Sequence, residues 1–273
     1  MGLDLRSALV AAGLCSLLAG PSAVRADDDL PLSTDRPDQT DSTDTTPTRH
    51  FQLETGWQRT RDEAGGERLE LDAAFGTLLR YGWSERFELR LGWLGWLTAR
   101  ERDAAGGATA SGAGDGSLGF KLRLLDAAGA RPAVAVEART SLPVGARNLS
   151  SRRTDPAVLL AVQHNLSTQV SLGWNAGVAW SSEENEAGGR QTLSSLLASA
   201  SLGVTFNDRL SGFVELFGAG AGSAAGASAL SADGGLLWLL GRHLQLDLYA
   251  GEGLDAAAPD TFFGCGVSLR LPA

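Results

Sequence analysis

The chain has 273 residues and a formal net charge of −9 at pH 7, and 43% of its residues are hydrophobic. The acidity is concentrated in residues 27–48, which hold seven Asp and one Arg. Recognition of nucleic acid requires a basic face, and this composition offers none. No nucleic-acid partner is therefore expected.

The first 26 residues are typical of a secretory signal peptide. Arg6 precedes an apolar run from Ala8 to Gly20, and small residues surround a cleavage position after Ala26. The run is too short and wrongly flanked for a membrane helix, although an N-terminal membrane anchor is the alternative. Cleavage leaves Cys265 as the only cysteine, which excludes an internal disulfide and a multi-cysteine metal site.

Residues 27–48 form a predicted acidic leader that is rich in Thr, Asp and Pro. Two structures are compatible with this composition: a disordered, solvated periplasmic tail, or a plug that folds into the mouth of a barrel. The lack of apolar residues favours a solvated segment over a calcium-binding one, and both the tail and the plug remain open. The leader lacks the ligand spacing of a calcium-binding loop, so no metal site is expected in it.

Residues 49–273 alternate with a period of two, which indicates strands with one apolar and one polar face. Leu69, Leu71, Ala73, Phe75, Leu79 and Tyr81 share one parity, and so do Phe87, Leu89, Leu91, Trp93 and Leu97. The pattern predicts twelve strands: 50–60, 67–82, 85–100, 115–126, 132–143, 156–166, 168–182, 190–206, 209–221, 228–241, 242–252 and 261–271.

The connections between these strands alternate roughly between short and long. The long ones, rich in Gly, Ala, Ser and Asn, are residues 102–116, 144–155 and 181–190. This pattern is typical of an outer-membrane barrel, and several strands exceed the five to six residues that are usual in a soluble β-sandwich. The sequence thus predicts an all-β protein: a single antiparallel transmembrane β-barrel of about 12 strands. An even number of strands places both the first and the last strand end on the periplasmic side.

Charged residues on the polar parity are predicted to line the lumen. An Arg or Lys that faces lipid at mid-depth costs about 2–4 kcal/mol, so a set this large has to face a wet or mutually paired interior. The repeated Glu-x-Arg step at Glu88/Arg90 and Glu137/Arg139 suggests a network with Glu54 rather than separate ligand contacts. The full set is Glu54, Arg68, Glu70, Asp72, Arg80, Glu88, Arg90, Lys121, Arg123, Glu137, Arg139, Glu215, Asp247 and Arg270.

Catalytic chemistry has weak support in the sequence. A lipid hydrolase needs Ser, His and an orienting polar group within reach, and residues 163–167 offer His164, Asn165 and Ser167. On a strand, however, His164 and Ser167 point to opposite faces. The three scattered His residues show no metal-ligand spacing either. We therefore expect no enzyme, no catalytic or metal-binding residues and no cofactor, with a lipid hydrolase as the remote alternative.

Short motifs along the chain carry a family resemblance. It begins at "TDRPDQTDS" and "RHFQLETGW", where Arg49 replaces the usual Gly, and continues through "RYGWSERFELRLGW", "SLPVG", "GFVELFG" and "PDTFFGCGVSLRL". Over residues 34–271 the chain resembles the outer-membrane barrels grouped as the "MetA-pathway of phenol degradation" family. The resemblance implies a link to aromatic-compound catabolism, without implying an enzyme or fixing a substrate.

These observations predict a non-enzymatic channel or uptake protein in a Gram-negative outer membrane. The domain organisation is a signal peptide (1–26), the acidic leader (27–48) and the barrel (49–273). The expected partners are outer-membrane lipid, the barrel-assembly machinery and a small molecule, for which the resemblance implies an aromatic compound. The rival hypothesis is a structural or assembly barrel whose lumen is closed by salt bridges.

Overall fold

A computed structural model describes residues 32–184, 190–221 and 228–272. The predicted signal peptide and residues 27–31 of the leader lie outside the described residues. The strands are β1 (His50–Ala64), β2 (Glu67–Ser84), β3 (Phe87–Trp93), β4 (Trp96–Asp103), β5 (Gly106–Ala113), β6 (Gly116–Leu125), β7 (Ala133–Leu142), β8 (Pro156–Asn165), β9 (Val170–Glu184), β10 (Arg190–Asn207), β11 (Leu210–Ala221), β12 (Ala229–Leu239), β13 (Leu244–Gly253) and β14 (Thr261–Pro272).

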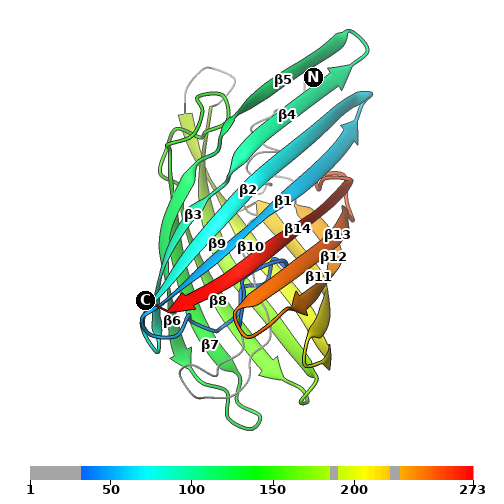
Figure 1. Cartoon of the computed structure of the whole chain (residues 1–273). Helices are drawn as coiled ribbons and strands as arrows, with labels where there is room; N and C mark the ends of the chain where they lie inside the picture. The colour runs from blue at the N-terminus through cyan, green and yellow to red at the C-terminus, as the bar shows by residue number, and fades with distance from the viewer. Residues whose placement is uncertain (1–31, 185–189, 222–227, 273) are drawn as a thin grey trace.

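These elements form one closed antiparallel barrel (Figure 1). Strand β1 closes it, because β1 pairs with β14 on one side and with β2 on the other. Strands β3 and β4 are the two halves of one interrupted strand that pairs with β2, and β5 and β6 are the halves of the next. The described part of the chain therefore has the predicted 12-stranded wall. It contains no helix with the length and apolar character that a membrane crossing would need.

Burial follows the predicted alternation along most strands. In β3 the side chains of Glu88 and Arg90 are buried, whereas Leu89 and Leu91 are exposed on the outer face. Burial of charged groups and exposure of leucines is the reverse of a soluble protein and is the pattern of a barrel that faces lipid. Both ends of the wall lie together, since His50 pairs with Pro272. We call this the terminal end and the opposite end the loop end.

Two irregularities reverse the facing of neighbouring residues. In β2 the register shifts opposite Gly56/Trp57, and Phe75 takes a positive φ of 62°. Between β3 and β4 the chain turns at Gly95, whose φ is 83° and where a Cβ would lie 2.2 Å from the carbonyl oxygen of Ala74. Only glycine fits such a position. Leu69, Leu71 and Leu97, predicted on the lipid-facing parity, are consequently buried on the inner side.

The β4–β5 hairpin extends the wall beyond its neighbours at the loop end (Figure 1). Residues 106–113, predicted as part of a long link, form β5 and pair with β4 alone. The link 143–155 folds back against this hairpin, where the amide of Ala146 donates to the carbonyl oxygen of Ala113 at 2.7 Å. Leu149 from this link packs with Leu71 and Leu97 in a buried cluster.

Candidate functional site

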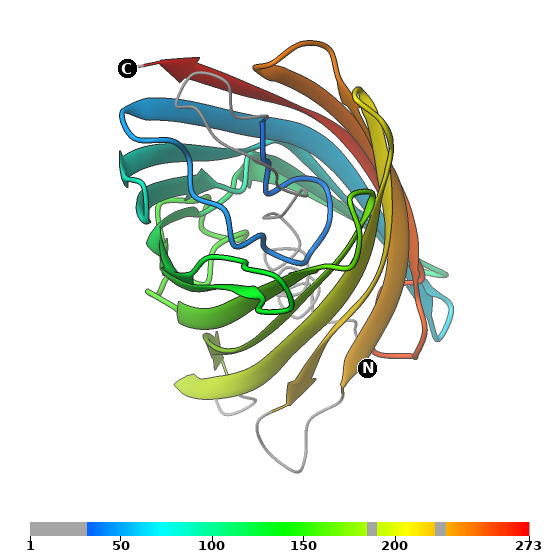
Figure 2. The ribbon, with the colours of Figure 1, turned by 90° about the horizontal axis from the view of Figure 1, so that it is seen from below.

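The leader segment, residues 32–48, lies inside the barrel and extends across the lumen that the ring of strands encloses (Figure 2). Eight of its fourteen polar side chains are buried, and the other six are partly buried. The buried ones are Thr34, Asp35, Asp38, Thr40, Asp41, Ser42, Thr43 and Thr46. The sequence leaves a solvated tail and a plug open, and residues 32–48 have the buried arrangement. Polar groups of the inner wall solvate the leader in place of water, which is the only way such a segment can be buried cheaply.

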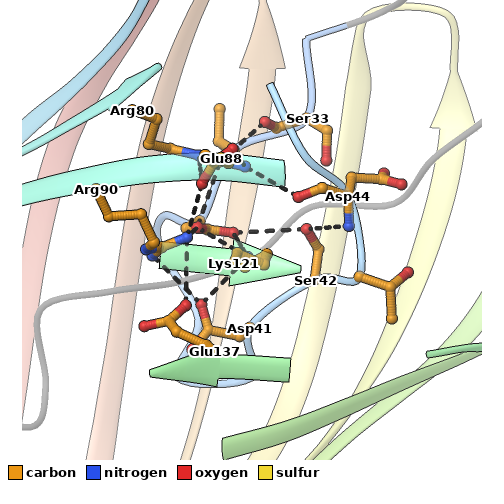
Figure 3. Close-up of polar contacts among 12 residues, drawn as sticks. Ser33, Asp41, Ser42, Asp44, Arg80, Glu88, Arg90, Lys121 and Glu137 are labelled. Atoms are coloured by element: carbon orange, nitrogen blue, oxygen red, sulfur yellow. Dashed lines mark hydrogen bonds and ion pairs between the residues drawn. The ribbon is translucent and has the colours of Figure 1, made fainter. Parts of the chain in front are cut away.

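Figure 3 shows the wall residues Arg80, Arg90 and Lys121 beside Asp41 and Asp44 of the leader. Asp35 is the centre of the contacts on this wall. Its carboxylate lies 3.0 Å from Lys121 Nζ and 3.4 Å from Arg80 Nη1, and it also pairs with Arg90. Its backbone amide donates to Glu54 Oε2 at 2.8 Å. Burial acts to raise the pKa of Asp35, but these three cations outweigh it and hold the pKa well below the usual range.

The same cations connect the acids of the wall with one another. Arg80 donates to Glu54 and to Glu88 at 2.9 Å each. Arg90 lies 3.1 Å from Glu88 and 3.3 Å from Glu137. Glu137 in turn accepts from Arg139 at 3.0 Å. The two Glu-x-Arg steps on β3 and β7 are thus joined through Arg90, in the kind of network that their shared parity suggests.

The leader backbone is held by the same wall. Arg80 donates to the carbonyl oxygens of Ser33 and Asp44, at 3.3 and 3.1 Å. The amide of Thr46 donates to Glu88 Oε2 at 2.6 Å. Arg123 donates to the Thr43 carbonyl oxygen at 3.2 Å and to the Asp44 carboxylate at 2.8 Å. Backbone groups of a non-repetitive segment need such partners when they are buried.

The opposite wall holds the leader mainly through acceptors. The amide of Gln39 donates to Glu215 at 2.6 Å, and the Thr40 hydroxyl donates to the same carboxylate. Asn175 both accepts from the amide of Asp41, at 2.5 Å, and donates to its carbonyl oxygen, at 3.0 Å. Because its contacts reach strands on both sides of the ring, the leader is anchored across the lumen.

Arg36 forms a third anchor, on β13. It lies 3.1 Å from Asp247 and 5.8 Å from the ring of Tyr249. Gly56 and Gly266 face each other beneath it, and a Cβ at Gly266 would lie 2.3 Å from the Arg36 guanidinium. This pair of glycines gives the guanidinium room to lie against the wall.

Asp41 has a less favourable environment than Asp35. It lies 3.6 Å from both Lys121 and Arg90, and neither of its carboxylate oxygens accepts a hydrogen bond. Burial, together with the neighbouring Glu137 carboxylate, raises the pKa of Asp41 to about 8. Asp35 and Asp41 of the leader therefore differ in charge state near neutral pH.

Eleven of the fourteen predicted lumen residues belong to these contacts or lie beside them. Arg270, for example, is buried and donates to Gln52 at 3.2 Å. The remaining three, Arg68, Glu70 and Asp72, are placed differently. They oppose Glu63, Arg61 and Arg59 of β1, which share the outward parity of Trp57.

The β2 bulge at Phe75 is the physical reason for this correction, because one extra residue moves all preceding side chains to the other face. On the outer face Asp72 accepts from Arg59 at 2.7 Å and from Arg100 at 2.5 Å. Glu70 lies 3.4 Å from Arg61, and Arg68 lies 2.6 Å from Glu63. These pairs form a separate, half-exposed set near the loop end.

The inner wall also carries three apolar clusters. Two lie toward the loop end: Leu71, Leu97, Ala99 and Leu149 in one, and Ala157, Leu159 and Leu197 in the other. The third adjoins the leader and contains Phe213, Leu237, Tyr249 and Phe262, with Phe217 packed against it. The inner surface is therefore polar where the leader crosses it and partly apolar and aromatic elsewhere.

Sequence reasoning missed the leader acids Asp35, Asp38, Asp41 and Asp44, together with Asn175 and Asp233 on the wall. A signal for the leader was present, since Asp recurs at every third residue from 35 to 44. The hydrolase alternative gains nothing from the structure. Ser167 accepts from the amides of Gln169 and Val170 and so closes the turn before β9.

The fold resembles solved transport proteins of the outer membrane. The NanC porin superposes with a TM-score of 0.54 at 8% sequence identity, over 81% of this chain and 100% of that chain. The transport unit of the autotransporter AIDA-I from Escherichia coli gives 0.50 at 8% identity, over 82% and 89%. At such identities the likeness shows the fold alone, that of outer-membrane barrels. No curated protein matches the sequence.

A family model matches residues 34–271, from the leader motif to the last strand. The match includes the TDRP segment that supplies Thr34, Asp35 and Arg36 to the lumen. The chain belongs to the family described as "Putative MetA-pathway of phenol degradation".

Proposed function

We propose that the protein is a non-enzymatic outer-membrane channel for the uptake of small apolar or aromatic molecules, with the leader as its gate. The observation that carries the proposal is the division of the inner surface. Apolar and aromatic side chains line the wall toward the loop end and beside the leader, whereas the leader crosses the lumen in a polar belt. Sites for small apolar ligands are lined mainly by such side chains.

The family description supports the substrate class, because it places relatives in phenol degradation. In this proposal the terminal end faces the periplasm. A molecule enters at the loop end, contacts the apolar clusters and passes the leader when the leader moves.

The ion-pair network favours a second candidate function, a structural barrel with a permanently closed lumen. Arg80, Glu88 and Lys121 are buried together with Asp35, and a network of this kind is difficult to open. The two functions differ in whether any condition or ligand releases the leader.

Flux into proteoliposomes separates the two candidates. The channel is expected to pass phenol faster than a neutral sugar of similar size. Leu159→Asp, which places a charge in an apolar cluster of the wall, is expected to slow phenol and leave the sugar unchanged. The matched control is Leu160→Asn on the outward parity of the same strand. Phenol flux that stays equal to that of protein-free liposomes across the pH and salt conditions that weaken the leader's ion pairs would support the closed structural barrel instead.

A further inference from the structure

Strands β1, β2 and β4 lie side by side toward the loop end (Figure 1), and their outer face changes there from uncharged to charged. The outward residues of β1 carry no charge from Phe51 to Trp57 and are charged from Arg59 onward. Trp96 lies in the same row as Trp57, because both pair with one residue of β2. A tilted strand crosses the hydrocarbon in about 9–11 residues, and aromatic side chains mark the boundary. The charged rows therefore lie at the level of the lipid head groups.

Three rows of outward side chains follow the tryptophans, and each row takes one residue from β1, β2 and β4. The rows are Arg59–Asp72–Thr98, Arg61–Glu70–Arg100 and Glu63–Arg68–Arg102. They hold five arginines and three acids, and the two surplus positive charges lie in the two rows nearer the loop end. The adjoining outward positions on β5 and β14 are uncharged: Gly107, Thr109, Ser111, Thr261 and Phe263.

Carboxylates at the edge of this face are engaged with backbone amides. Asp103 accepts from the amides of Ala105 and Gly106 in the β4–β5 turn. Asp260 accepts from the amide of Glu63 at 2.9 Å. The arginines therefore outnumber the acids that share their face.

Two of these arginines lack a full set of partners. Arg61 lies 3.4 Å from Glu70, yet its Nε is buried without a hydrogen-bond acceptor. Arg102 stands directly opposite Arg68, and no carboxylate in residues 32–184, 190–221 and 228–272 pairs with Arg102. Like charges in directly opposed positions destabilise a sheet, and a donor without an acceptor calls for an explanation. An anion supplied from outside the protein would satisfy both.

The guanidinium groups are also the outermost part of this face. The side chains of Arg61, Arg68 and Arg100 are 42%, 44% and 37% exposed, whereas those of Glu70 and Asp72 are 20% and 13% exposed. A molecule that approaches from the membrane therefore meets positive charge first. The planar guanidinium fork fits the oxygens of a phosphate group, which it can bind through two parallel hydrogen bonds.

We propose that this arginine face binds the phosphate groups of a phosphorylated lipid in the outer leaflet of the membrane. Hydroxyl groups adjoin it, because Ser111 donates to Thr98 at 3.2 Å in the row above the tryptophans. Arg59 lies 5.6 Å from the centre of the Trp57 ring, so the charged face continues directly into the apolar one. The arginine face consists of Arg59, Arg61, Arg68, Arg100 and Arg102. The proposal shares with the channel only the orientation in which the loop end faces outward.

Binding of lipid A, which carries two phosphates, tests the proposal. The purified barrel with its leader is immobilised in neutral detergent and titrated with lipid A, with the same lipid after removal of its phosphates, and with inorganic phosphate. Wild type is expected to bind lipid A saturably and at least about tenfold more tightly than the dephosphorylated lipid, since a hydrogen bond to a charged group contributes about that factor. Inorganic phosphate, which lacks the acyl chains, is expected to compete only at large excess.

The double variant Arg68→Gln/Arg102→Gln removes the opposed pair of charges. It should bind lipid A at least about tenfold more weakly than wild type and the dephosphorylated lipid equally well. The matched control is Arg209→Gln/Arg242→Gln, which removes two exposed arginines from turns at the terminal end and should bind as wild type does. Heat-modifiable mobility on gels verifies that each variant is folded.

Three results would overturn the proposal. Equal binding of both lipids by wild type would mean that acyl chains alone are bound. Equal binding of lipid A by wild type and Arg68→Gln/Arg102→Gln would place the phosphates elsewhere. Competition by inorganic phosphate at the concentration of the lipid would indicate a general anion site. Since no transport is measured, failure here leaves the channel proposal standing, and a silent channel leaves the lipid site standing.

Discussion

Asp35 and Asp72 are each held by arginines in this barrel, yet they differ in their surroundings. Asp35 is fully buried among Arg80, Arg90 and Lys121, whose side chains are at most 3% exposed. Asp72 lies on the outer face between Arg59 and Arg100, whose side chains are 28% and 37% exposed. The contact distances are similar, so geometry alone does not rank the two clusters.

Water makes the difference between them. An exposed pair is screened, and its loss costs little. In a desolvated cluster the loss of one partner leaves charges that nothing else can balance. The comparison predicts that the inner cluster controls both stability and gating and that the outer one controls neither. The following experiments test that ranking, from the largest expected effect to the smallest.

Deletion of residues 27–48 should have the largest effect, because it removes all leader contacts together. The lumen loses the segment that crosses it, and a barrel of this size without a plug leaves room for solute. Single-channel recording in planar bilayers is expected to show a marked rise in conductance over the full chain. Unchanged conductance would mean that the leader does not close the lumen.

Asp35→Asn should be the most harmful single substitution. It leaves Arg80, Arg90 and Lys121 without their shared counter-ion, and breaking a buried ion cluster costs about 3–5 kcal/mol. Urea unfolding in detergent measures the loss. A cost similar to that of Asp72→Asn would show that the lumen is wet and would remove the contrast between the clusters.

Glu137→Gln and Arg139→Gln test how far the desolvated network extends. Glu137 is buried and contacts both Arg90 and Arg139, whereas Arg139 is partly exposed. Glu137→Gln should therefore cost more than Arg139→Gln. A double-mutant cycle should give a coupling of about 0.5–3 kcal/mol. If the stability losses of the two single variants simply add, the Glu137–Arg139 pair is solvated and lies outside the desolvated network.

The pH dependence of stability should report Asp41. Its pKa is raised to about 8 in the folded protein, compared with about 3.9 for an unperturbed Asp. Folding therefore keeps a proton on this carboxyl. The stability that this proton contributes is complete below pH 4 and is lost as the pH rises toward 8.

Urea unfolding between pH 5 and 9, with Asp41→Asn as the reference, isolates that contribution. Wild type should lose stability relative to Asp41→Asn as the pH rises. A difference that is constant, or that grows in favour of wild type, would contradict the raised pKa.

Asp72→Asn should have the smallest effect, about 1 kcal/mol or less, because its arginine partners remain solvated. The variant should also conduct as wild type does. A larger loss of stability would mean that the outer face at the β2 bulge is covered, and the comparison between the two clusters would then fail.

Strands β2 and β3 show how well alternation in the sequence predicts which side chains face the lumen. The regular alternation in β3 correctly predicts that Glu88 and Arg90 are buried and that Leu89 and Leu91 face outward. The same reasoning gives the wrong face for Asp72 and Leu71, because one residue with positive φ at Phe75 breaks the period. A bulge of this kind depends on how two strands pair, which a parity count within one strand does not contain.

The sequence by itself determined the class of protein: an all-β barrel of 12 strands with charges on the inner parity, in the family that its short motifs suggest. These follow from local alternation and from the high cost of exposing charge to lipid, both of which act residue by residue. Only the tertiary structure decided where the leader lies. A chain of Thr, Asp and Pro has no apolar surface to drive its burial, so its composition leaves a tail and a plug equally open. It is buried because strands distant in sequence bring Arg80, Arg90, Lys121 and Asn175 around it, and that match between leader and wall exists only in the closed barrel.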